Sequence, residues 1–150
     1  MKTFVSKTGV LLVSALLLSC VHNDDLCCGP DMPLEGPLIG EWLLYESGWS
    51  IGSGYDVAAI PAEPAQKFIF TNNRKFTTTM AMADAPKFFR VLDDPNSELN
   101  ILALYETDPG DAAQDISNLD HSYTIKFDEG NLKLYYRWCV EGCHLAFKRL

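Results

Sequence analysis

Positive charge is scarce in this 150-residue chain, which has 12 Lys and Arg residues against 20 Asp and Glu residues and a formal net charge of −8. Binding to nucleic acid phosphates needs clustered Lys and Arg side chains, and the sequence has no such cluster. We therefore expect no nucleic acid partner. The dispersed acidic residues are typical of a solvated surface.

A hydrophobic segment long enough to span a bilayer is also missing. The N-terminal apolar segment, residues 10–18, is shorter than the roughly 20 residues that a transmembrane helix needs. It follows Lys2 and Lys7 and ends beside the small residue Ser19. A basic region, a short apolar region and a small residue at the cleavage point are typical of a secretory signal peptide, which is removed.

The residues Leu17-Leu18-Ser19-Cys20 resemble the lipobox of bacterial lipoproteins, in which signal peptidase II cuts before a cysteine that carries diacylglycerol. The resemblance implies a signal peptide over residues 1–19 and lipidation of Cys20 by acyl chains such as palmitate. Each buried methylene contributes about 0.8 kcal/mol, so several acyl chains hold a domain on a membrane almost permanently. Val21 stands where an aspartate would resemble an inner-membrane retention signal. We therefore expect an outer membrane lipoprotein, on the periplasmic face or the cell surface.

Cleavage before Cys20 removes 19 residues and two lysines, which leaves 131 residues with a net charge of −10. This length is enough for one domain with its own core. Residues 27–40 are rich in Pro and Gly, which sustain neither a helix nor a strand ladder. The sequence therefore predicts a lipidated tether over residues 20–38 and one domain over residues 39–150.

Helical periodicity is lacking in that domain, and period-two alternation takes its place. Eight segments are rich in aromatic and β-branched residues and predict strands. They are residues 40–47, 66–71, 75–81, 87–92, 99–105, 121–127, 131–138 and 143–149. In the last three, one parity is apolar and the other carries Lys and Arg, as a sheet with one solvated face requires.

A meander of about eight antiparallel strands avoids unpaired edges best by closing into a barrel. We therefore predict an all-β fold, a single antiparallel up-and-down β-barrel, with a β-sandwich as the alternative. A barrel of this size holds one small ligand or is filled by its own side chains.

Gly40-Glu41-Trp42 at the start of the first strand and Arg149 near the end of the last resemble the lipocalin superfamily. In that superfamily the tryptophan closes one end of the barrel and the arginine lies across its ring in a cation–π contact. Arg149 has the inward parity of Leu145 and Phe147. The resemblance therefore assigns Trp42 and Arg149 to barrel closure.

The C-terminal residues resemble more closely the lipocalin-like lipoproteins of Bacteroidetes, which end in a Cys-x-Glu-Gly-Cys hairpin and an aromatic-Lys-Arg strand. Here these features are residues 139–143 and Phe147-Lys148-Arg149. Together with the lipobox and the first strand, they imply a small lipocalin-like domain anchored to a membrane at its N-terminus.

Four cysteines remain beside the lipidated Cys20, and in an oxidising compartment we expect them to be paired. Cys139 and Cys143 flank a three-residue loop and face each other within bridging distance, so we favour this pair. It leaves Cys27 and Cys28 as a vicinal pair. Crossed bridges, which would fix the tether to the final hairpin, are the alternative.

No catalytic or metal signature stands out. Residues 48–52 match G-x-S-x-G, but that motif works where a strand turns sharply into a helix, and no helical pattern follows. His121 and His144 lack a third ligand at a suitable spacing, and the acidic residues of 106–120 lack the spacing of a calcium loop. We therefore expect neither an enzyme nor a metal or cofactor.

The long segment 47–66 carries Trp49 and Tyr55 and is predicted to line or cover the mouth of the barrel. Two functions fit the sequence. One is a binding module for a small apolar or amphipathic molecule, with walls from Phe68, Phe70, Ile125 and Tyr136. The other is a non-catalytic envelope protein whose barrel is filled and whose loops contact a partner, because a filled core and a pocket use the same residue types. The oligomeric state stays open.

Overall fold

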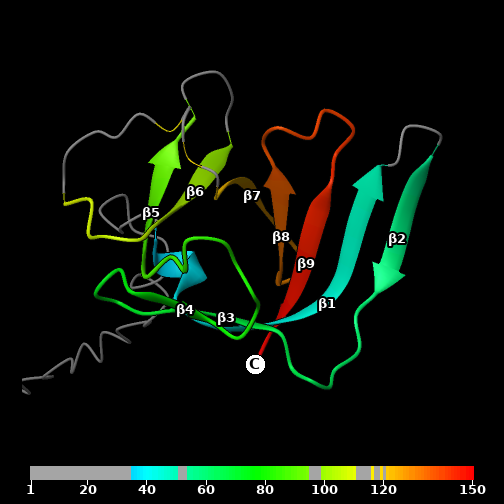
Figure 1. The fold of residues 1–150 in the computed structure, drawn as a ribbon, viewed down its shortest axis with the longest axis horizontal. Helices are drawn as coiled ribbons and strands as arrows, with labels where there is room; N and C mark the ends of the chain where they lie inside the picture. The colour runs from blue at the N-terminus through cyan, green and yellow to red at the C-terminus, as the bar shows by residue number, and fades with distance from the viewer. Residues whose placement is uncertain (1–34, 51–53, 95–98, 111–115, 117–118, 120) are drawn as a thin grey trace, which may run out of the picture.

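The computed structural model describes residues 35–50, 54–94, 99–110, 116, 119 and 121–150. In these residues a 3₁₀ helix, η2 (Gly36–Leu38), precedes nine strands (Figure 1). The strands are β1 (Gly40–Ser50), β2 (Tyr55–Ala59), β3 (Lys67–Phe70), β4 (Phe76–Thr78), β5 (Phe88–Asp93), β6 (Asn100–Tyr105), β7 (Ser122–Asp128), β8 (Asn131–Tyr136) and β9 (His144–Arg149). No helix within these residues is long and apolar enough to cross a membrane. The predicted signal peptide, Cys20, Cys27 and Cys28 lie outside the described residues.

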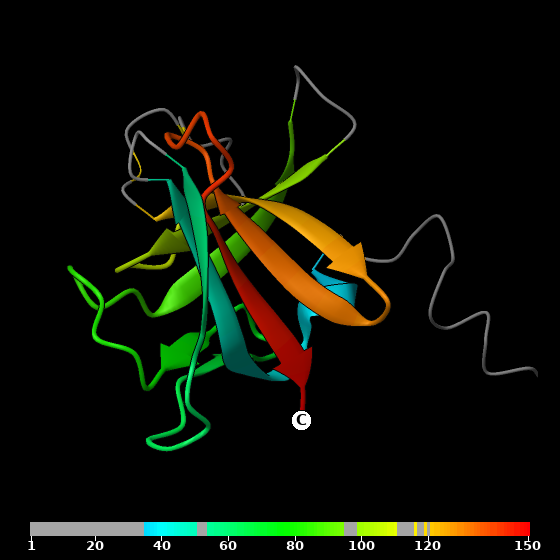
Figure 2. The ribbon, with the colours of Figure 1, turned by 90° about the vertical axis from the view of Figure 1, so that its right-hand side faces the viewer.

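The strands form an antiparallel sheet in the order β4-β3-β1-β9-β8-β7-β6-β5, which curls round into a barrel (Figure 2). The first strand lies beside the last, as Trp42 pairs with Arg149 and Leu44 with Phe147. The remaining seam, between β4 and β5, is joined by one bridge, Lys75 to Phe88. The prediction of an all-β, lipocalin-like up-and-down barrel is therefore confirmed, in a form that is nearly closed.

Alternation along the strands fills the barrel with apolar side chains. In β8, Leu132 and Leu134 are fully buried, whereas Lys133 between them reaches solvent beside Asp128. The largest fully buried rings of the core belong to Trp42, Phe68, Phe70, Phe76, Phe89 and Phe147. The centroids of the five phenylalanine rings lie at contact distance, for example 4.7 Å from Phe68 to Phe147. The middle of the barrel is a packed aromatic core.

Strand β2 differs from the prediction, which placed its residues in a long loop. Because β3 pairs with β1 only along Gly40–Leu43, the C-terminal half of β1 has an open edge. Strand β2 fills this edge, opposite Glu46–Ser50. The pairing depends on where β3 begins, at Lys67 opposite Leu43, which the local residues of β2 do not reveal.

A β-bulge in β1 changes which side chains point inward. The register with β9 shifts between Leu44 and Glu46, so that Tyr45 is the additional residue. Trp42 and Leu44 share the inward side before the bulge, and after it Ser47 and Trp49 do. The bulge therefore carries Trp49 to the inner side of the sheet.

One end of the barrel is closed by Trp42. Its indole Nε1 donates a hydrogen bond to the Leu38 carbonyl at 2.7 Å. The Arg149 guanidinium carbon lies 5.2 Å from the centroid of the Trp42 ring, and Nη2 donates to the Ile39 carbonyl at 2.5 Å. Both side chains assigned to barrel closure therefore meet at this end.

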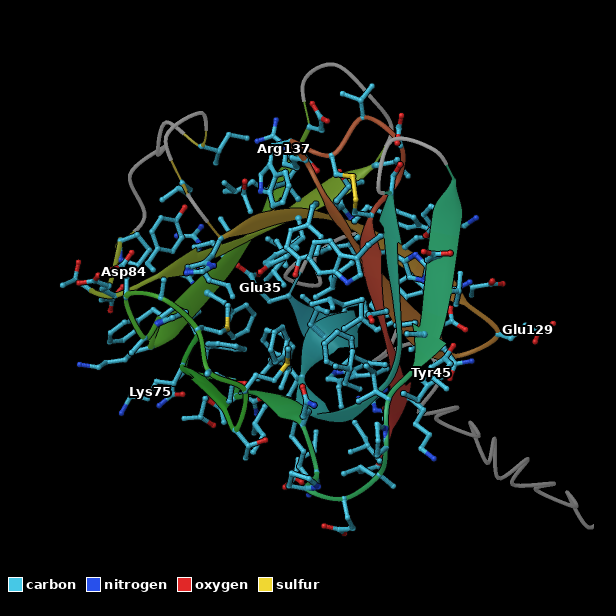
Figure 3. All side chains as sticks on the ribbon, turned by 45° about the vertical axis from the view of Figure 1, so that its right-hand side comes forward. Glu35, Tyr45, Lys75, Asp84, Glu129 and Arg137 are labelled. Carbon is cyan, nitrogen blue, oxygen red and sulfur yellow. A yellow bond between two sulfur atoms is a disulfide. The ribbon has the colours of Figure 1, made fainter. Side chains whose placement is uncertain are left out.

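The domain begins earlier than the predicted boundary at residue 39. Leu38 is 1% exposed and belongs to the core. Glu35 is buried as well, near the centre of the molecule in Figure 3, with its carboxylate 3.3 Å from Arg90 Nε and 3.9 Å from Arg74 Nε. Residues 35–38, which were assigned to the tether from their Gly and Pro content, therefore pack against the barrel. Within them, Glu35 connects the two sides of the seam through Arg74, just before β4, and Arg90 in β5.

Candidate ligand site at the barrel mouth

A cavity of about 240 Å³ opens where the β8–β9 hairpin meets the loop after β4. Strands β3, β7, β8 and β9 supply its floor, and Met80–Ala83 and Trp138 supply its rim. Figure 3 labels Asp84 and Arg137, which mark these two bordering loops. The cavity is lined by Phe68, Met80, Ala81, Met82, Ala83, His121, Tyr123, Tyr136, Trp138 and Leu145.

The rim loop forms because β4 ends at Thr78. The Thr78 hydroxyl accepts a hydrogen bond from the Met80 amide at 2.9 Å, which turns the chain out of the sheet. Met80 and Met82 then pack against the core as partly buried side chains. Methionine adapts its shape readily, so this wall suits ligands of varied outline.

Aromatic rings gather around Tyr136 on the other wall. The centroids of the Trp49, Tyr123 and Trp138 rings each lie 5.1 Å from that of Tyr136. We call these four residues the aromatic cluster. Trp138 is 63% exposed although its ring contacts Tyr136 at an interplanar angle of 51°, so much of the Trp138 ring remains available at the rim.

Two kinds of polar group accompany these apolar walls. His121 Nε2 lies 2.8 Å from the Ala83 carbonyl oxygen, which only accepts, so Nε2 carries a hydrogen and donates it. Burial raises the pKa of the Tyr136 hydroxyl, and burial together with the nearby Tyr136 raises the pKa of Tyr123 further. Both phenols are therefore neutral near pH 7.

A second hollow of about 300 Å³ lies beside η2 at Glu35, Arg74 and Phe89. It is also lined by Gly36, Ile39, Thr71 and Asn72. Its carboxylate and guanidinium groups already lie close together. The barrel mouth is therefore the better-defined ligand site.

The residues proposed from the sequence as ligand contacts divide into three groups. Phe68 and Tyr136 line the mouth cavity, and Trp49 supports it through Tyr136. Phe70 and Ile125 belong to the packed core. Tyr55 lies on the outer side of the sheet, where its hydroxyl contacts His144 Nδ1 and lies 3.2 Å from the Gly142 carbonyl.

The position of Tyr55 follows from the pairing of β2 with β1. Tyr55 stands opposite Ser50, on the side of Gly48 that faces away from the barrel interior. A Cβ at Gly48 would lie 2.2 Å from the Tyr55 hydroxyl, so the glycine makes room for this ring. His144 Nε2 in turn lies 3.0 Å from Glu46 Oε1.

Met80, Met82, His121, Tyr123 and Trp138 were missed as ligand contacts. Tyr123 and Trp138 had the inward parity of their strands, which was a usable signal. Met80 was assigned to a strand over 75–81 and Met82 to no predicted strand, and their place on the rim depends on the turn after Thr78. The approach of His121 to Ala83 joins loops distant in sequence and had no local signal.

The other motifs take ordinary structural places. Cys139 and Cys143 form a disulfide with their Cα atoms 5.6 Å apart, which confirms the favoured pairing. Ser50 of the G-x-S-x-G match lies in β1 opposite Tyr55. Within the part of the chain that the structure describes, no three His, Cys, Asp or Glu residues are grouped to hold a metal ion.

Comparisons with protein-family models, with curated proteins and with solved structures gave no match to this chain.

Proposed function

We propose that this chain is a lipid-anchored, lipocalin-like binding protein whose barrel mouth holds one small apolar or amphipathic molecule. The observation that carries the proposal is the open cavity between the aromatic cluster and Met80 and Met82. Ligand sites are typically concave and apolar with a few convergent polar groups. His121 and the two neutral phenols supply such groups here.

The volume of the cavity limits the buried part of the ligand. A cavity of about 150 Å³ encloses benzene, so 240 Å³ suits about ten non-hydrogen atoms. The packed phenylalanines below Phe68 leave the deeper barrel to the protein's own side chains. A larger amphipathic molecule would place a flat apolar end against Trp138 and Tyr136 and leave its polar end in solvent.

Binding of 2-naphthol, a flat fluorescent probe with one hydroxyl, tests the proposal. We expect Trp138→Ala to weaken binding about tenfold, because it removes a stacking ring and its buried area. Val140→Ala, in the same hairpin at a fully exposed position, is the matched control and should bind as the unaltered chain does. Equal affinity of the Trp138→Ala variant would contradict this site.

The anchor is a separate part of the proposal. It rests on the resemblance of residues 17–20 to a lipobox, and Val21 after Cys20, where an aspartate would resemble a retention signal, favours the outer membrane of a bacterium. Cys20→Ser should abolish labelling by an alkyne fatty acid and release the protein into the soluble fraction. Unchanged labelling would refute the anchor and leave the ligand site untouched.

A filled barrel that acts through its loops is the second function. It is favoured by Val140 and Trp138, which are 100% and 63% exposed on one hairpin. Under this alternative, 2-naphthol would not bind, and Val140→Ala together with Trp138→Ala would weaken contact with an envelope partner.

A further inference from the structure

Strand β2 lies at the margin of the molecule (Figure 1), with one edge paired to β1 and the other facing outward. All five of its residues are exposed, including Tyr55 at 45% and Val57 at 54%. Among the described residues, no second strand pairs with β2. This edge is separate from the mouth cavity, and the inference drawn from it does not rest on the proposed function.

The direction of the backbone groups in β2 follows from its register. The Ile60 amide donates to the Tyr45 carbonyl at 2.9 Å, so these residues form a hydrogen-bonded pair. Such pairs alternate with non-hydrogen-bonded ones along an antiparallel ladder. Asp56 and Ala58 therefore bond to β1. The N–H and C=O groups of Tyr55, Val57 and Ala59 point to the outer edge.

Free edges of this kind are usually protected by lysine, proline or a bulge, because they template pairing with another strand. The sequence of β2, Tyr-Asp-Val-Ala-Ala, contains neither lysine nor proline, and its register with β1 is regular. Its single charge is Asp56. The edge is therefore open to another strand.

We propose that β2 pairs antiparallel with β2 of a second copy of this chain, with Val57 on the twofold axis. In this register Val57 faces Val57 of the partner copy, and each Tyr55 faces Ala59 of the other chain. All outward N–H and C=O groups of these three residues then find partners. Asp56 lies opposite Ala58, so the only charges in the two strands do not oppose each other.

The side chains fit the same arrangement. Tyr55, Val57 and Ala59 share the outer side of the sheet, and each large Tyr55 ring meets a small Ala59. The Tyr55 ring is already held against His144, with centroids 6.0 Å apart, so pairing orders few additional groups. The result is a twofold dimer with one sheet continuous through both barrels.

Cross-linking tests the register directly. In full-length protein with Cys20, Cys27 and Cys28 replaced by serine, Val57→Cys should form a disulfide-linked dimer under mild oxidation. Hydrogen-bonded residues opposite each other have Cα atoms about 5.5 Å apart, within the range that a disulfide spans. Ala58→Cys is the matched control and should cross-link at least tenfold more slowly. Equal rates for the two variants would overturn the proposed register.

Sedimentation at 200 µM protein tests the role of the backbone. Val57→Pro removes the outward N–H while the hydrogen bonds of Asp56 and Ala58 to β1 stay in place. We expect it to weaken dimerisation at least tenfold, whereas Val57→Thr keeps the N–H and should dimerise as the unaltered chain does. A monomeric unaltered chain, or a Val57→Pro variant that dimerises equally well, would refute the proposal. Circular dichroism of the proline variant shows that it remains folded.

Discussion

The contact between Trp42 and Arg149 gives the sharpest test of barrel closure, because the two residues stand on the first and last strands. Trp42→Phe removes the indole N–H and leaves the buried Leu38 carbonyl without its donor. A buried group left unpaired costs about 1–3 kcal/mol. Arg149→Met removes the cation over the ring and the hydrogen bond to Ile39.

The coupling between the two substitutions measures the contact itself. A cation over tryptophan contributes about 0.5–1 kcal/mol at an exposed site, and Arg149 is exposed. Both side chains also hold the same segment before β1. We therefore expect a coupling free energy of about 1 kcal/mol in a double-mutant cycle followed by urea unfolding.

The same cycle with Arg137→Met in place of Arg149→Met is the matched control. Arg137 is an exposed arginine in the β8–β9 hairpin, so its effect should add to that of Trp42→Phe within about 0.3–0.5 kcal/mol. If the effects of Trp42→Phe and Arg149→Met on the free energy of unfolding also added within this range, closure of the barrel through their contact would be refuted.

Three further predictions concern stability. Gly40 has a φ of +137°, which residues with a side chain rarely adopt, so Gly40→Ala should lower the free energy of unfolding in urea by about 1–3 kcal/mol. An unchanged free energy of unfolding would show that alanine fits this backbone conformation without strain. Replacing Cys139 and Cys143 by serine should cost about 2 kcal/mol for so short a loop, and loss of less than 0.5 kcal/mol would show that the bridge contributes little. Burial raises the pKa of Tyr136 above 10.0, so it favours the folded state below about pH 10, and this contribution is lost as the pH rises further. Tyr136→Phe should therefore lose less stability than the unaltered chain as the pH rises above 10, and parallel losses in urea titrations would contradict this origin.

Local alternation was enough to predict most of the barrel. Strand β8 buries only one parity, as its alternation predicted. The inward parity of Arg149 also agreed with the contact to Trp42 that the lipocalin resemblance implied. Such predictions succeed because the period of two and the inward side are properties of each strand alone.

Features set by distant pairing were not predictable in this way. Strand β2 exists because β3 leaves half of β1 uncovered, and Tyr55 points outward for the same reason. The bulge at Tyr45 turns Trp49 inward, which no alternation within β1 indicates. Phe70 and Ile125 point inward, as residues that line a cavity would, but neighbouring side chains pack against them and bury them in the core.

The ligand site could be predicted in part. Phe68 and Tyr136 were found because the cavity continues the inner side of the sheet. Met80 was assigned to a strand because the pattern of residues 75–81 favours extension, whereas the hydrogen bond from the Met80 amide to the Thr78 hydroxyl ends β4. Met82 lay outside every predicted strand.

Occupation of the barrel mouth by a small apolar or amphipathic molecule is the basis of the proposed function. Native mass spectrometry of the full-length protein purified from its own membrane tests it most directly. We expect the mass of the anchored protein plus one small molecule, which organic solvent releases and which the Trp138→Ala variant retains poorly. The mass of the anchored protein alone, for the unaltered chain under the same gentle conditions, would contradict it.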